Sequence, residues 1–119
     1  MVFITGGAYQ GKLDFAREKF ALTDEDIYIC TEDAEPDWSR RCLTHLERYA
    51  YYCVKNGRLP EDRSGGNAVM IGDDIFCGVV PIDPTERAWR EETGRFYGRL
   101  STRAEKVWRL FCGLPMELK

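Results

Sequence analysis

An apolar run that meets a glycine-rich turn constrains the fold of this chain more than any other stretch. After Val2-Phe3-Ile4, Gly6 is followed by four residues and then by Gly11-Lys12. This is the spacing of a phosphate-binding loop, G-x-x-x-x-G-K-[ST], in which glycines let backbone N–H groups turn toward an anion. The dipole of the next helix adds positive charge there. The pattern predicts a strand, a phosphate-binding loop and a helix over residues 13–20; the alternative is a glycine-rich turn without a ligand.

The last position of the motif departs from the pattern. Lys12 is expected to reach the β- and γ-phosphates, whereas the next position, which usually offers a hydroxyl to Mg²⁺, holds Leu13. A Mg²⁺ ion would therefore need another protein oxygen, or only water and phosphate oxygens. We predict that ATP or GTP binds through the loop, with the binding residues Gly6, Gly7, Ala8, Tyr9, Gln10, Gly11, Lys12 and Leu13.

The length and composition of the chain suit one compact domain. With 119 residues, 44% of them hydrophobic, a single domain over residues 1–119 is expected. The net charge of −3 argues against nonspecific nucleic-acid binding. No apolar run approaches a membrane span and no signal-peptide pattern is visible, so we expect a cytoplasmic protein without a membrane partner. The cysteines form no C-x-x-C pair and are expected to be small core residues in a reducing compartment: Cys30, Cys42, Cys53, Cys77 and Cys112.

Short apolar runs alternate with helical patterns over the rest of the chain. Near-continuous apolar runs between helices indicate a parallel sheet that is covered on both faces. We therefore predict an α/β fold of the P-loop NTPase (RecA-like) kind, with a mainly parallel sheet and flanking helices. Besides the first strand, strands are expected over residues 26–31, 67–72 and 107–112, with a short edge strand over 116–119.

Two longer helices are expected. An amphipathic stripe predicts one helix over residues 39–56. Asp83 followed by Pro84 predicts the start of another, because Asp caps helices and Pro suits the first helical position. Two glycines inside that second helix, Gly94 and Gly98, are costly there and indicate either a close approach or a break near Gly98.

Several segments of the second half form a specific combination with the glycine-rich loop. They are Cys77-Gly78-Val79-Val80-Pro81, Arg87 to Glu91, Gly94-Arg95-Phe96-Tyr97-Gly98-Arg99-Leu100, Ala104 to Trp108, and Cys112 to Lys119. The combination resembles the bifunctional adenosylcobinamide kinase/adenosylcobinamide-phosphate guanylyltransferase family. That family shows G-[IL]-V-P after a strand ending in Asn-Glu, then R-x-x-x-G-R-x-N-Q-R-L, A-[DE]-x-V and a G-[IL]-P-x-x-[IL]-K tail. The resemblance covers roughly the first 30 and the last 50 residues.

The chain also departs from this family. The region between Thr31 and Ala68 is much shorter than in the family. The missing part includes the segment whose histidine becomes guanylylated and, we expect, the strand that bears the second acidic, Mg²⁺-associated residue. Asp73-Asp74 stands in place of the family's Asn-Glu, and Tyr97-Gly98 in place of its Asn-Gln.

Three sets of residues are candidates for chemistry. His45, the only histidine, is either a nucleophile or an ordinary helix-surface residue, and its sequence context favours the second. Asp74 follows an apolar strand at the family's Glu position, so it is the candidate catalytic and Mg²⁺-binding carboxylate, the alternative being a solvated turn. Arg95 and Arg99 occupy matched family positions and are candidates for phosphate contact, the alternative being a solvated face.

The resemblance implies a function in cobalamin biosynthesis. It implies transfer of the γ-phosphate of ATP or GTP to adenosylcobinamide, with Lys12 and Asp74 as the catalytic residues, Mg²⁺ as cofactor, a corrinoid as substrate and a homo-oligomeric assembly. The guanylyltransferase step is not expected. The alternative is a relative that binds nucleotide without catalysis, which Leu13 and the missing segment favour.

Overall fold

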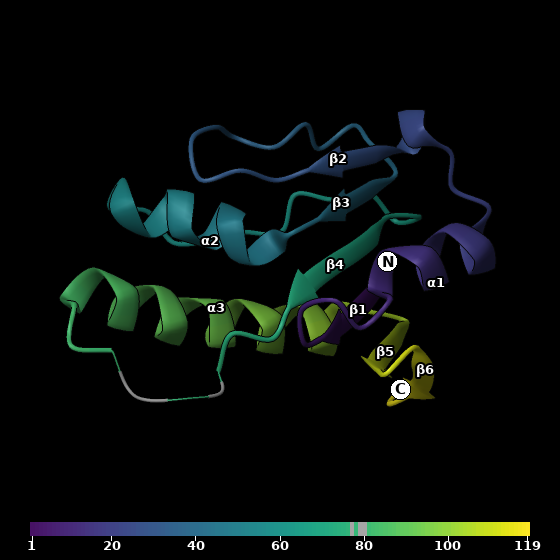
Figure 1. The fold of residues 1–119 in the computed structure, drawn as a ribbon. Coiled ribbons are helices and arrows are strands. Elements are labelled where there is room, and N and C mark those ends of the chain that lie inside the picture. Colours follow the sequence, from purple (N-terminus) through teal and green to yellow (C-terminus); the bar gives the residue numbers. More distant parts are fainter. Residues whose placement is uncertain (77, 79–80) are drawn as a thin grey trace.

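The computed structural model describes residues 1–76, 78 and 81–119. One six-stranded sheet forms its centre, with the strand order β2-β3-β4-β1-β5-β6 (Figure 1). Neighbouring strands are parallel except β5 and β6, which are antiparallel. The predicted α/β fold with a mainly parallel sheet is therefore confirmed. The strands are β1 (Val2–Gly6), β2 (Ile27–Ile29), β3 (Cys42–Thr44), β4 (Val69–Asp73), β5 (Lys106–Phe111) and β6 (Leu114–Glu117).

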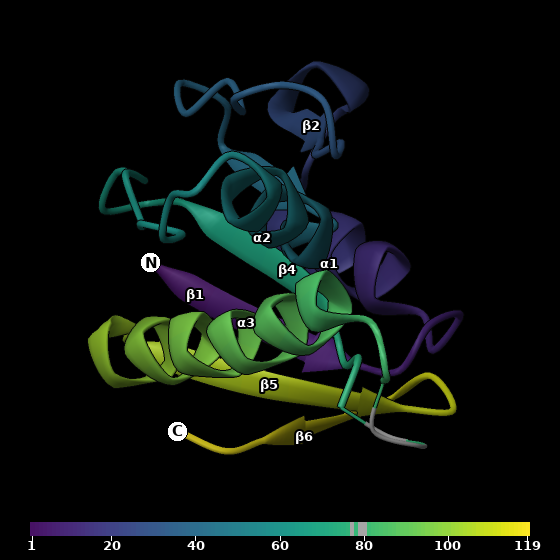
Figure 2. The ribbon, with the colours of Figure 1, turned by 90° about the vertical axis from the view of Figure 1, so that its left-hand side faces the viewer.

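Helices cover both faces of the sheet. α1 (Lys12–Phe20) lies on one face, whereas α2 (Leu46–Lys55) and α3 (Pro84–Arg103) pack together on the other (Figure 2). A short 3₁₀ turn, η1 (Asp24–Asp26), leads into β2. Because side chains alternate along a strand, Phe3 joins the core cluster below α2 and α3, and its neighbour Ile4 joins the cluster below α1.

The larger core lies under α2 and α3 and is rich in aromatic rings. Tyr49 of α2 and Phe96 of α3 are fully buried, and their ring centroids lie 5.8 Å apart in an edge-on arrangement. The Phe3 ring of β1 lies 5.0 Å from the ring of Tyr97. Burial of this apolar surface fixes both helices against the sheet.

The helix predicted to begin at Asp83 is present as α3. An Asp83 carboxylate oxygen accepts a hydrogen bond of 2.9 Å from the Thr85 N–H, and Pro84 occupies the first turn. The helix continues without interruption past Gly98, so the expected break is absent from it. The expected close approach is absent too: a Cβ atom at Gly94 would make only an ordinary contact of 3.6 Å with the ring of Phe76, and one at Gly98 would meet no described atom within 4 Å.

The helix predicted over residues 39–56 is wrong in its first part. Residues Cys42–Thr44 form the strand β3, which pairs with β2 on one side and β4 on the other, and the helix begins only at Leu46. All three strand residues are buried, so the apolar run fitted a helical stripe as well as a strand inside a sheet. The region between Thr31 and Ala68 therefore supplies one strand of the sheet.

The cysteines are only partly core residues. Cys30, Cys42 and Cys53 are buried free thiols, as predicted, whereas Cys112 is exposed because it lies in the turn between β5 and β6. Cys77, and with it Val79 and Val80 of the family-like segment, lies outside the described residues. Within the described part of the chain, none of the helices has the length and apolar character that crossing a bilayer requires.

Candidate functional site

The glycine-rich loop connects β1 to α1, as predicted. Gly6, at φ 150°, ends the strand, and a Cβ atom there would lie 2.5 Å from the Leu110 carbonyl oxygen. Gly11 adopts a left-handed conformation with φ 84° immediately before the helix. No side chain caps the N-terminus of α1, so the first N–H groups of this helix remain available to an anion.

Lys12 lies across the loop rather than pointing into solvent. Its side chain is 7% exposed, its ammonium donates to the Gly7 carbonyl oxygen at 2.6 Å, and it forms an ion pair of 2.8 Å with Asp73 Oδ1. Asp73 is the last residue of β4 and pairs in register with Gly6. The parallel register therefore places a carboxylate beside the loop lysine.

A pocket of about 460 Å³ opens over the loop and the carboxyl ends of the parallel strands. In parallel α/β sheets this edge is where ligands bind. The exposed Arg48 of α2 also lines the pocket, so Lys12 and Arg48 are its two cations among the described lining residues. The lining residues are Ala8 to Asp14, Thr44, His45, Arg48, Ile71 and Asp73.

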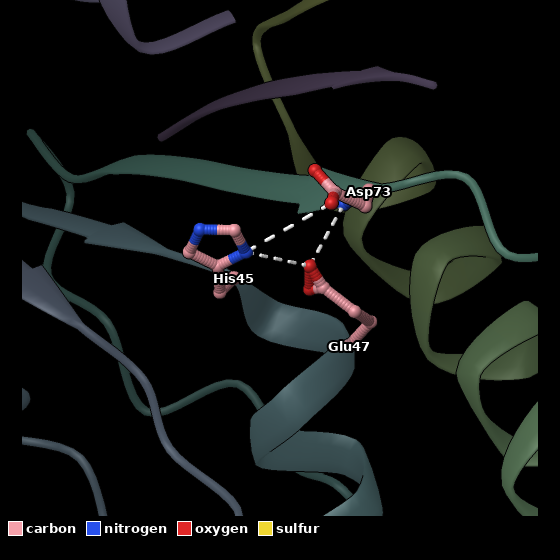
Figure 3. Close-up of side chains that lie close together, drawn as sticks. All are labelled: His45, Glu47 and Asp73. Carbon is pink, nitrogen blue, oxygen red and sulfur yellow. Dashed lines mark hydrogen bonds and ion pairs between the residues drawn. The ribbon is translucent and has the colours of Figure 1, made fainter. Parts of the chain in front are cut away.

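A histidine and two carboxylates lie close together beside this pocket, and the histidine and one of the carboxylates also line it (Figure 3). His45, between β3 and α2, has a left-handed backbone with φ 59°, which turns its ring toward the pocket. Its Nδ1 lies 3.1 Å from Glu47 Oε1 and 3.9 Å from Asp73 Oδ2. The expectation of an ordinary helix-surface histidine is therefore wrong, because the strand β3 ends directly before His45.

Glu47 is a buried acidic residue of the first turn of α2. It is 5% exposed, and its Oε1 accepts from the Asp73 N–H at 3.4 Å, whereas Oε2 finds no hydrogen-bond partner in the described part of the chain. Burial raises the pKa of the Glu47 carboxyl, and the nearby charge of Asp73 raises it further. The backbone at Glu47 is held in place because its carbonyl oxygen accepts from the Trp89 indole N–H at 2.7 Å.

Asp74, the predicted catalytic and metal-binding residue, does not share this arrangement. Its N–H donates to the Gly6 carbonyl oxygen at 2.8 Å, and its carboxylate accepts from the Phe76 N–H at 3.0 Å. The carboxylate that contacts Lys12 belongs to Asp73 instead. The alternation of side chains along a strand separates the two neighbours, and the sequence pair Asp-Asp alone did not reveal which one faces the loop.

The two predicted phosphate-binding arginines also lie away from the loop. Arg95 pairs with Glu92 on the surface of α3, and Arg99 donates to the Pro60 carbonyl oxygen at 2.8 Å. Both line a separate depression with Arg103. Sequence reasoning missed Arg48 and Glu47 and favoured a surface role for His45, because all three follow β3. The position of β3 was the one signal able to place them at the strand edge.

The loop is also joined to the end of the chain. The Gln10 side-chain oxygen accepts a hydrogen bond from the Cys112 N–H, and the Gln10 carbonyl oxygen accepts from the Gly113 N–H at 3.1 Å. The turn between β5 and β6, which belongs to the family-like tail, thus supports the loop directly. These contacts join the two parts of the chain that resemble the family.

A comparison with known protein families agrees with the resemblance. Residues 60–118 match the model described as cobinamide kinase / cobinamide phosphate guanyltransferase, whereas the glycine-rich loop precedes the matched range. No curated protein matches the chain. The matched family is one of nucleotide-dependent enzymes of cobalamin biosynthesis. Through the matched residues 60–118, the chain belongs to the cobinamide kinase / cobinamide phosphate guanyltransferase family.

Proposed function

We propose that this chain binds the triphosphate of ATP or GTP at residues 6–13 and transfers the γ-phosphate to an alcohol, as an adenosylcobinamide kinase does. The observation that carries the proposal is the position of Lys12, buried over an uncapped helix N-terminus at the floor of the pocket. Phosphate oxygens there would accept from the loop N–H groups and from the lysine.

Two cations in the lining of the pocket support phosphoryl transfer. In this proposal Lys12 exchanges its hydrogen bond to the Gly7 carbonyl for the γ-phosphate, and Arg48 approaches the same oxygens from α2. The acceptor alcohol attacks the γ-phosphorus, the bond to the β,γ-bridging oxygen breaks, and the alcohol proton passes to water. Gly6, Gly7, Ala8, Tyr9, Gln10, Gly11 and Leu13 remain the proposed contacts of the nucleotide; Arg95 and Arg99, which lie elsewhere, are left out.

The loop does not fit the usual arrangement for Mg²⁺. The Leu13 side chain, at the position of the usual hydroxyl, packs against the core cluster below α1. Asp74, the expected ligand, is engaged with the Phe76 N–H. A Mg²⁺ ion held by Leu13 or Asp74 therefore has no part in the proposed transfer.

Guanylyl transfer is not part of the proposal. The family's guanylylated histidine lies in a segment that this chain lacks, and His45 comes from the end of β3 instead. A corrinoid remains the proposed acceptor on the strength of the family match over residues 60–118. A cytoplasmic location is proposed with it, since the buried cysteines Cys30, Cys42 and Cys53 are free thiols.

A homo-oligomer also belongs to this proposal. β6 is the last strand of the sheet, and large apolar side chains around it are exposed. They are Phe111, Leu114, Met116 and Leu118. A second copy that covers this edge would shelter them from water. Light scattering of the purified chain and of Leu114→Glu tests this: the variant should have the lower mass.

The second candidate function is nucleotide binding without catalysis. Leu13 and the ion pair between Lys12 and Asp73 favour it, because a lysine already neutralised has less charge to offer a transition state. The two functions differ in turnover rather than in affinity.

Calorimetric titration of ATP and GTP tests both functions. The chain should bind at least one nucleotide, Lys12→Ala should abolish binding, and the exposed Lys55→Ala on α2 should not alter it. Turnover of nucleotide with adenosylcobinamide would support the kinase, and binding without turnover would support the second function. If neither nucleotide binds the intact chain, both functions are wrong.

A further inference from the structure

Three side chains from two strand ends and one helix place their donor atoms around a single point (Figure 3). One imidazole nitrogen of His45, one oxygen of Glu47 and one oxygen of Asp73 all lie within 4.8 Å of one another. Donor atoms bound to one small cation lie about 3 to 3.5 Å apart, since each sits roughly 2.1 Å from the ion. The observed separations of 3.1 Å and 3.9 Å from His45 are close to these values.

A second observation points to a missing ligand. Glu47 is only 5% exposed, and its Oε2 has no hydrogen-bond partner among the described residues. A buried charged oxygen without a partner is costly unless an ion or a proton satisfies it. The same carboxylate directs its other oxygen to His45, so the unsatisfied group belongs to the cluster itself.

We propose that His45, Glu47 and Asp73 bind one divalent cation of the zinc and cobalt type in preference to Mg²⁺. An imidazole nitrogen with two carboxylate oxygens suits Zn²⁺ and Co²⁺, whereas Mg²⁺ favours oxygen ligands and retains its water. The three protein ligands leave one position open toward the pocket, which also contains Lys12.

The cation and the loop lysine are compatible. Asp73 divides its oxygens: Oδ1 pairs with Lys12 at 2.8 Å and Oδ2 faces His45. Binding of an ion at Oδ2 therefore leaves the lysine contact in place. The metal site itself does not rest on the proposed nucleotide function, because all three ligands come from the protein. Only the function of the open coordination position rests on it.

Cobalt absorption is the direct test. Co²⁺ is titrated into the tag-free chain without nucleotide, and visible bands of a four- or five-coordinate ion should grow to one equivalent. Zn²⁺ should then displace the bands stoichiometrically, whereas Mg²⁺ in large excess should not. Charge-transfer absorption from a thiolate would instead place the ion on a cysteine and overturn the assignment.

Single substitutions locate the ion. His45→Asn keeps a residue that tolerates the left-handed backbone, and Glu47→Gln and Asp73→Asn keep the side-chain shapes. Each should weaken Co²⁺ binding at least about 100-fold, because loss of even an outer-shell partner costs roughly 10- to 100-fold. Asp14→Asn is the matched control, since Asp14 is an exposed carboxylate that lines the same pocket but lies outside the cluster.

Each outcome decides the proposal. If Co²⁺ fails to bind the intact chain, or if none of the three substitutions weakens it, the site is wrong. Circular dichroism of each variant shows whether a loss of binding reflects unfolding. Only the variants that remain folded are used to judge the site. Nucleotide titration of the metal-free chain is a separate result, so failure of the metal site and failure of nucleotide binding are distinguishable.

Discussion

The Lys12 ammonium lies 2.8 Å from Asp73 Oδ1, and both side chains are largely removed from water. The contact joins the first residue of α1 to the last residue of β4, across the strand end at which Gly6 faces Asp73. A lysine with 7% exposure depends on this partner, because an unpaired buried charge is expensive. The ion pair therefore helps to fix the shape of the pocket.

Removal of the Asp73 charge should destabilise the protein more than removal of the neighbouring charge. We expect Asp73→Asn to lower the free energy of unfolding by roughly 3 kcal/mol, the order found when one partner of a buried pair is lost. Asp74→Asn keeps an acceptor for the Phe76 N–H and should cost about 1 kcal/mol or less. Urea unfolding of the metal-free, nucleotide-free variants measures both; equal effects would contradict the structural difference between the two residues.

The two glycines at the start of the loop should respond differently to a methyl group. Gly6→Ala places Cβ 2.5 Å from the Leu110 carbonyl oxygen at a φ of 150°, so backbone atoms must move. We expect about 2 kcal/mol or more of destabilisation. Gly7→Ala meets only the flexible Gln10 side chain, at 3.6 Å, and should change the stability by less than about 1 kcal/mol. Thermal melting compares them, and a destabilised Gly7 variant would show that the loop is tighter than described.

Arg48 should matter more for nucleotide binding than the arginines of α3. Arg48 lines the loop pocket, whereas Arg95 pairs with Glu92 at a distance from it. A charge-assisted hydrogen bond contributes about 1.5 to 3 kcal/mol, so Arg48→Ala should weaken triphosphate binding by at least about tenfold. Calorimetry of Arg48→Ala and Arg95→Ala measures the difference. A larger loss of affinity in the Arg95 variant would show that α3, rather than α2, contacts the phosphates.

The cysteines should differ in reactivity and should limit stability at alkaline pH. Burial raises the pKa of both Cys30 and Cys42 to about 12, so iodoacetamide should label exposed Cys112 in the folded protein and leave these two unmodified. In the unfolded chain the same thiols ionise near their ordinary value of about 9, and they therefore release protons that the folded state retains. Their contribution to stability is thus complete below about pH 9 and is lost as the pH rises toward 12.

Peptide mapping and alkaline unfolding check this prediction. Labelling of Cys30 in the native protein as fast as that of Cys112 would mean that the sheet opens readily at β2. Replacement of Cys42 by Ala should reduce the loss of stability above pH 9, because one ionising thiol is removed from the unfolded state.

The hydrogen bond between Gln10 and the β5–β6 turn should stabilise the nucleotide-binding loop. Its side-chain oxygen accepts from the Cys112 N–H, so Gln10→Ala removes one bond between the loop and the β5–β6 turn. We expect nucleotide affinity to fall about fivefold, which corresponds to about 1 kcal/mol for one hydrogen bond. Amide hydrogen exchange at Cys112 should become faster in the same variant. Unchanged exchange would show that the turn is held without Gln10.

The sequence predicts those features that depend on local chemistry. The glycine loop, α1 and the capped start of α3 each follow from a few adjacent residues with strong backbone preferences. β3 was missed because three buried residues fit two periodicities, and only pairing with β2 and β4 decides between them. The cluster at the pocket was missed with it, since His45 and Glu47 reach Asp73 only through the position of β3 in the sheet.

The place of β1 in the sheet has a consequence for how this chain can be divided. The residues that match the family supply β4 and β5, yet these two strands are not neighbours: β1 lies between them and pairs with both. A polypeptide cut before residue 60 therefore yields two pieces of which neither completes a sheet alone. The two pieces should instead reassociate when mixed, with β1 inserting between β4 and β5. The start of the matched range therefore does not coincide with a structural boundary.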